Sequence, residues 1–124
     1  MVKTAGLSHI QLVVRDLDRS LAFYTRVFGM KEQFREGKHM VFLSTPGAHD
    51  LITLNQDLKN LKRAGDNGGM NHFGFRLIDA AEMDAAVVDV TNGGGTLIAR
   101  GEHAPGVLYA YVKDPDGYVI ELMA

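Results

Sequence analysis

Residues 7–14 alternate between apolar and polar side chains. Leu12 and Val14 fall on one face of this segment, while His9 and Gln11 fall on the other. A period of two residues is typical of a β-strand with one buried face. The segment therefore predicts a strand whose second face carries an imidazole near the beginning.

The pattern becomes helical directly after this strand. Asp16 is suited to begin a helix and Gly29 to end one, because a carboxylate accepts bonds from free amides and glycine adopts the left-handed conformation of helix ends. Between them, apolar side chains recur at helical spacing at Leu17, Leu21, Tyr24 and Phe28. Three short strands separated by glycine and proline turns are expected next, at residues 31–35, 39–43 and 50–54. The predicted order is βαβββ.

The second half of the chain repeats this order. Three pairs of landmark residues are each 63 positions apart (72 − 9, 79 − 16 and 92 − 29), namely His9 and His72, Asp16 and Asp79, and Gly29 and Asn92. A helix is expected to end near Asn92, and strands are expected at residues 72–78, 96–99, 108–113 and 118–123.

This repeat predicts the organisation of the whole chain. We expect one α+β domain over residues 1–124, with module one at about 5–54, a polar connection at about 55–69 and module two at about 70–124. The expected architecture is a mixed eight-stranded sheet that curls around a cleft, with the helices outside. Pairing of the modules, within one chain or between two chains, buries the sheet face that each leaves exposed.

Composition narrows the functional classes. The chain has 124 residues, of which 46% are hydrophobic and 23% charged, and its net charge of −2 argues against a nucleic-acid-binding surface. It contains neither a signal-like N-terminus nor a run of 18 apolar residues, so we expect a cytoplasmic protein that binds no membrane. The absence of cysteine excludes thiolate metal sites, and any metal must use nitrogen and oxygen ligands.

Three residues form the candidate metal site. His9 and His72 occupy matching places at the start of the two modules, and Glu121 lies in the last predicted strand. Two imidazoles and one carboxylate suit a divalent first-row metal and leave positions open for a substrate. Each could also be an ordinary hydrogen-bonded sheet or surface residue, which is the better interpretation of His9 taken alone. The repeat favours the metal interpretation.

The chain also resembles a known family along essentially its whole length. The vicinal oxygen chelate superfamily is similar in its module starts and final hairpin to the stretches LSHIQLVVRDLDRSLAFYTRVFGM, MNHFGFRL and YAYVKDPDGYVIEL. The resemblance implies metal ligands on the first and last strands of each module, here His9, a residue near Thr53, His72 and Glu121. Glyoxalase I places a carboxylate at the position near Thr53, so the resemblance implies a site with three protein ligands.

Residues outside the triad resemble extradiol ring-cleaving dioxygenases. The string HDLITL, which begins at His49, is similar to a strand whose leading histidine acts as acid and base beside bound oxygen. The segment from Gly101 to Tyr111 resembles a closing segment in which a histidine and a tyrosine hydrogen-bond the substrate, which implies His103 and Tyr111. Each of these residues is also ordinary in an exposed turn or a half-buried strand.

The expected function is that of a metal-dependent extradiol-type dioxygenase. The resemblance implies a small catecholic or vicinal-oxygen substrate and O2, with Fe(II) as first choice of metal and Mn(II) as second, in a homodimer. Two alternatives stay open: a lyase, isomerase or fosfomycin-type thiol transferase with the same triad, and a metal-free dimer that sequesters an antibiotic. Arg76 and Gln11 share the inward parity of the ligand histidines, so each either contacts substrate or lies at a module edge.

Overall fold

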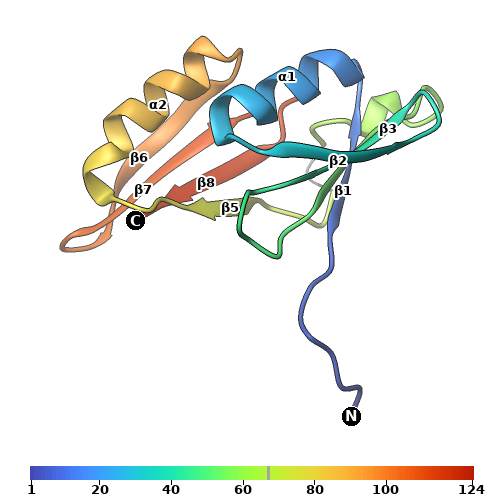
Figure 1. Cartoon of the computed structure of the whole chain (residues 1–124). Helices are drawn as coiled ribbons and strands as arrows, with labels where there is room; N and C mark the ends of the chain where they lie inside the picture. The colour runs from blue at the N-terminus through green and yellow to red at the C-terminus, as the bar shows by residue number, and fades with distance from the viewer. Residues whose placement is uncertain (67) are drawn as a thin grey trace.

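Two βαβββ modules make up the computed structural model, which describes residues 1–66 and 68–124 (Figure 1). Module one contains β1 (Ile10–Val14), α1 (Leu17–Phe28), β2 (Lys31–Glu36), β3 (Met40–Ser44) and β4 (Ile52–Gln56). A short 3-10 helix, η1 (Leu61–Arg63), lies in the connection. Module two contains β5 (Phe73–Arg76), η2 (Ala80–Glu82), α2 (Met83–Asn92), β6 (Thr96–Ala104), β7 (Val107–Lys113) and β8 (Val119–Met123).

Each module folds into its own four-stranded sheet. The strand orders are β1-β4-β3-β2 and β5-β8-β7-β6, and in each sheet the first and last strands of the module pair in parallel. The α+β fold is confirmed. The expected single eight-stranded sheet is corrected to two sheets, because β1 and β5 each end a sheet instead of pairing with one another.

The two helices lie side by side on one face of the sheets (Figure 1). The core forms there, with Leu12, Val14, Leu54, Ile120 and Leu122 at most 1% exposed. Phe28 of α1 stacks on Phe75 of β5 with ring centroids 4.2 Å apart, so one core serves both modules. Because side chains alternate along a strand, Gln11, Thr53 and Phe42 of sheet one, and Gly74, Glu121 and Tyr111 of sheet two, lie on the opposite face. We call this the helix-free face.

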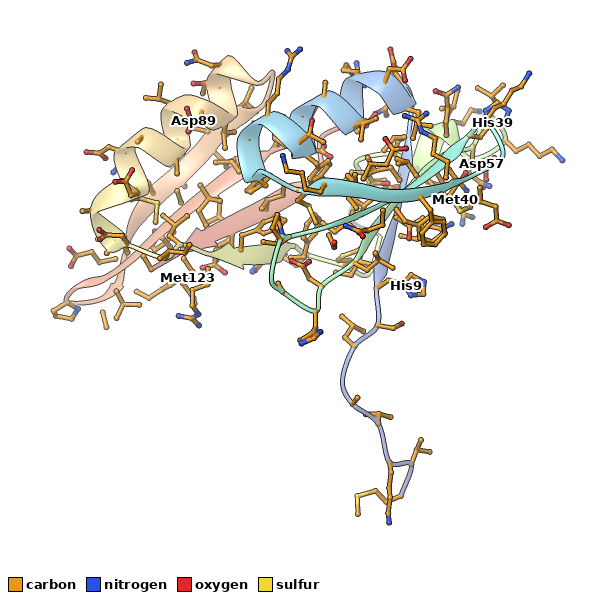
Figure 2. All side chains as sticks on the ribbon, in the orientation of Figure 1. His9, His39, Met40, Asp57, Asp89 and Met123 are labelled. Atoms are coloured by element: carbon orange, nitrogen blue, oxygen red, sulfur yellow. The ribbon has the colours of Figure 1, made fainter. Side chains whose placement is uncertain are left out.

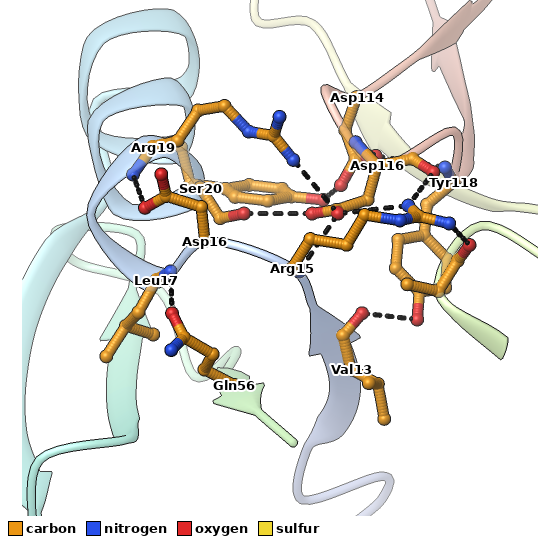
Figure 3. Close-up of polar contacts among 12 residues, drawn as sticks. Val13, Arg15, Asp16, Leu17, Arg19, Ser20, Gln56, Asp114, Asp116 and Tyr118 are labelled. Atoms are coloured by element: carbon orange, nitrogen blue, oxygen red, sulfur yellow. Dashed lines mark hydrogen bonds and ion pairs between the residues drawn. The ribbon is translucent and has the colours of Figure 1, made fainter. Parts of the chain in front are cut away.

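A buried carboxylate in the β7–β8 turn joins the two modules (Figure 3). Asp116 accepts hydrogen bonds from the backbone N–H of Arg15 at 3.1 Å, from the guanidinium of Arg19 at 3.1 Å and from the hydroxyl of Ser20 at 3.0 Å. The Arg15 guanidinium forms a further ion pair with it at 3.2 Å. Beside it, the Tyr24 hydroxyl donates to Asp114 at 2.8 Å. We call Asp116 and its three partners the Asp116 clamp.

Several element boundaries differ from the sequence-based prediction. His9 and His72 precede β1 and β5 instead of lying within them, and β4 begins at Ile52, two residues after the predicted start. The predicted strand 96–99 extends to Ala104, and all nine residues of β6 are exposed, so no apolar alternation marked its length. His103 therefore lies on a strand and not in a loop.

The predicted flexible connection at 55–69 is partly ordered structure. Its first two residues belong to β4, and Ala64 is buried. Gly65 has a φ of +74°, and a Cβ there would lie 2.0 Å from the carbonyl oxygen of Asp116, so only glycine fits against the turn. Asn67 lies outside the described residues. In the described part of the chain, no helix is long and apolar enough to cross a membrane.

Candidate metal centre

The carboxylate of Glu121 is the centre of a polar cluster on the helix-free face. Its Oε2 lies 3.2 Å from Nε2 of His72, and its Oε1 lies 2.6 Å from Nε2 of His103. His72 lies directly before β5, Glu121 lies on β8 and His103 lies on β6. Gly74 pairs with Glu121 across the strands, and a Cβ there would lie 2.9 Å from the Glu121 carbonyl oxygen. The absence of a side chain at Gly74 therefore allows the close approach of β5.

The electrostatics of the cluster favour an ionised carboxylate beside a neutral phenol. The hydrogen bond from His103 lowers the pKa of Glu121, and the charges of His103 and His72 act in the same direction against its desolvation. Desolvation raises the pKa of Tyr111, and the negative charge of Glu121 adds to this. At neutral pH the cluster therefore offers a carboxylate that can bind a cation and a phenol that can donate a hydrogen bond.

Four aromatic rings of this cluster form a row, in the order His72, Tyr111, Tyr109 and His103. The Tyr111 ring meets His72 edge to face at 5.1 Å, and its centroid is 5.3 Å from that of Tyr109. His103 stacks on Tyr109 at 4.3 Å. A Cβ at Gly101 would lie 3.0 Å from the Tyr109 hydroxyl oxygen, so this glycine leaves room for the ring to lie over β6. Tyr109 was not among the residues predicted for the site, although its strand parity with Tyr111 places it on this face.

His9 and His49 lie together in a neighbouring cavity of about 300 Å³. His49 is exposed in the loop before β4, and the Nδ1 of His9 is 2.8 Å from the Ser8 hydroxyl. Gly74 and Phe75 border both this cavity and a second one of about 320 Å³ that contains Glu121. The two cavities therefore adjoin at β5. Figure 2 shows the His9 ring beside the N-terminal end of β1.

The structure thus gathers the sequence-predicted residues into two groups. His72, His103, Tyr111 and Glu121 form one group, and His9 and His49 form the other. Among residues 1–66 and 68–124 of a single chain, no three His, Cys, Asp or Glu side chains are grouped so as to hold a metal. The ligand set of His9, His72 and Glu121 stays a prediction.

Thr53 occupies the place in module one that Glu121 occupies in module two. Gln11 pairs with Thr53 across parallel strands in the way that Gly74 pairs with Glu121. The Thr53 side chain is fully buried, and its hydroxyl has no hydrogen-bond partner among the described residues. Module one therefore offers a hydroxyl where a site with a fourth carboxylate ligand needs an acid.

Comparison with known proteins identifies the family of this chain. Residues 6–122 match the Glyoxalase/Bleomycin resistance protein/Dioxygenase superfamily. The chain is 33% identical to a probable lactoylglutathione lyase of Vibrio cholerae, over 93% of this chain and 87% of that protein. It is 29% identical to a catechol-2,3-dioxygenase of Bacillus subtilis, over 95% of this chain but 41% of that protein.

A solved structure shares the fold. The fosfomycin resistance protein of Listeria monocytogenes has a TM-score of 0.80 and 24% identity, over 98% of this chain and 94% of that one. A mutant of the same protein was crystallised with Mn(II). The family match spans nearly the whole chain and agrees with its paired βαβββ modules. The chain belongs to the Glyoxalase/Bleomycin resistance protein/Dioxygenase superfamily.

Proposed function

We propose that this protein is a metal-dependent enzyme for substrates with two neighbouring oxygens, and within that class an extradiol-type ring-cleaving dioxygenase. The observation that carries the proposal is the surroundings of Glu121. An ionised carboxylate lies beside one imidazole that suits a ligand, His72, and beside His103 and Tyr111, which suit substrate hydroxyls. The relative from Bacillus subtilis, named a catechol-2,3-dioxygenase, supports this choice.

The side chains at this site fit a divalent metal. His72 and Glu121 already lie in contact and provide nitrogen and oxygen donors, which first-row cations such as Fe(II) and Mn(II) accept. His9 would be the third ligand. When bound, the metal would supply positive charge that stabilises anionic substrate oxygens. The related fosfomycin resistance protein that was crystallised with Mn(II) supports a metal of this kind.

A second copy of the chain is our proposal for how His9 reaches the site. Among the described residues of one chain His9 is not grouped with His72 and Glu121, and neither α1 nor α2 covers the helix-free faces (Figure 1). A symmetric dimer in which sheet one of one copy faces sheet two of the other covers both faces and brings His9 towards the second copy's Glu121 cluster.

The chain's own residues would then share the work of binding and proton transfer. Tyr111 would donate a hydrogen bond from its phenol to a substrate oxygen, since its raised pKa keeps the phenol neutral. His103 would hold the Glu121 carboxylate in place and contact the second substrate hydroxyl. His49 would accept and return a proton, because an imidazole changes its charge near neutral pH.

A lyase is the second candidate. Relatives named lactoylglutathione lyase are the more similar by identity, at 33% in Vibrio cholerae and 34% in Salmonella typhimurium. Thr53 argues against this candidate, because a glyoxalase-type site places a carboxylate ligand at that position. A protein with glyoxalase activity would have to hold its metal without the fourth carboxylate.

The test combines metal analysis with oxygen uptake. Anaerobically purified protein loaded with Fe(II) should consume O2 with at least one substituted catechol. His72→Ala should lose most bound metal and this activity, whereas His39→Ala, at an exposed histidine outside the cluster, should retain both. If no catechol is consumed and the adduct of methylglyoxal and glutathione is turned over, the lyase replaces the dioxygenase.

A further inference from the structure

The cavity that contains Glu121 also contains an arginine. This cavity of about 320 Å³ is lined by Gly74, Phe75, Arg76, Glu121 and Met123. Gly74 pairs with Glu121 and Arg76 pairs with Met123 across β5 and β8. Alternate residues of a strand share a face, so Arg76 lies on the helix-free face about 7 Å along the strand from Gly74. Figure 2 shows Met123 on that face.

The charge of Arg76 is not neutralised within the part of the chain that the structure describes. No carboxylate oxygen there lies within 4.0 Å of its guanidinium, and it forms no side-chain hydrogen bond. Some other arginines of the fold do have acidic partners, as Arg15 and Arg19 have in the Asp116 clamp. Glu121 shares the cavity with Arg76, but its two carboxylate oxygens lie within hydrogen-bond distance of His72 and His103.

Two residues lie between the two charged groups on this face. Gly74 has no side chain and Met123 presents apolar thioether surface, while the Phe75 ring packs on the core side against Phe28. A ligand that reaches from Glu121 to Arg76 therefore crosses the Met123 side chain and ends at a cation. A guanidinium suits this end, because it stays charged at every physiological pH and its planar fork matches a carboxylate.

We propose that Arg76 binds a carboxylate of the substrate. The substrate would then carry its neighbouring oxygens at the Glu121 end, an apolar body over Met123 and a carboxylate at Arg76. This assignment rests on the proposed function only in placing the reacting oxygens at Glu121. Arg76 is a specificity-determining residue in this proposal, and it takes no part in proton transfer.

Binding of two matched probes tests the assignment. One probe is a catechol with a carboxymethyl group opposite a hydroxyl, and the other is its neutral carboxamide. Calorimetric titration of metal-loaded parent protein should show about tenfold tighter binding of the carboxylate probe, and this preference should weaken as salt is added. Arg76→Gln should remove the preference, and Arg76→Lys should retain part of it.

Arg26→Gln is the matched control, because Arg26 is exposed on α1 and has no acidic partner in the described residues. It changes the net charge equally and should keep the preference. The proposal is overturned if the parent binds both probes equally, binds neither, or if Arg76→Gln keeps the preference. An Arg76-dependent preference in a protein that consumes no O2 with any catechol supports this proposal and refutes the dioxygenase alone.

Discussion

Replacing Asp116 by alanine should be among the most destabilising changes outside the apolar core. The Asp116 side chain is fully shielded from solvent, and it accepts hydrogen bonds from an amide, a hydroxyl and two guanidinium groups. Its loss leaves the Arg15 amide and the Ser20 hydroxyl without that acceptor, at about 1–3 kcal/mol each. The two guanidinium groups are 44% and 45% exposed, so water replaces much of their pairing and each ion pair adds at most about 1 kcal/mol.

These contributions together amount to about 2–8 kcal/mol, and breaking a buried ion pair typically costs about 3–5 kcal/mol, a large share of the stability of an ordinary domain. Urea denaturation followed by circular dichroism measures the loss. Asp116→Asn keeps one acceptor oxygen and should lose about 1–2 kcal/mol. Arg19→Ala removes one partly exposed partner and should lose less than about 1 kcal/mol. A loss below about 1 kcal/mol for Asp116→Ala would refute the clamp as a link between the modules.

Three further changes test other parts of the structure. Burial, followed by the charge of Asp114, raises the pKa of Tyr24 well above 10.0. Because the folded-state pKa exceeds the unfolded one, the stability that the neutral phenol contributes is lost as the pH rises above about 10. Tyr24→Phe should therefore make the urea midpoint fall less between about pH 9 and pH 11. Gly65→Ala should cost at least about 2 kcal/mol in the same assay, since its Cβ would overlap the Asp116 carbonyl. Gly74→Ala should displace β8 and weaken metal binding measured by titration, and unchanged affinity would contradict the tight β5–β8 contact.

The internal repeat predicted much of the fold. β1 and β5 begin at Ile10 and Phe73, which lie 63 positions apart (73 − 10), as do the histidines before them. Strand register then confirmed that Thr53 is the counterpart of Glu121. Each strand and helix follows from its local amino-acid pattern, and the repeat follows from comparing these patterns between the two halves of the chain.

The sequence did not predict the features that depend on how the two modules pack against each other. In the sequence Asp116 was only one residue of the stretch that resembles the family's final hairpin, because its partners Arg15 and Ser20 are distant in the chain and lie in another module. The separation of His9 from the Glu121 cluster has the same origin. Spacing along a strand shows that two residues occupy equivalent places, but it does not place one sheet relative to another.

The β7–β8 hairpin links the cavity beside Glu121 to a backbone amide of module one. Its turn carries Asp116, which receives the Arg15 amide of module one, and its second strand carries Glu121. A ligand that restrains Glu121 also restrains this hairpin, so the Arg15 amide proton should exchange with solvent more slowly when the cavity is filled. Exchange at one backbone position in module one thus gives a readout of chemistry on the far strand of module two, without any label at the site itself.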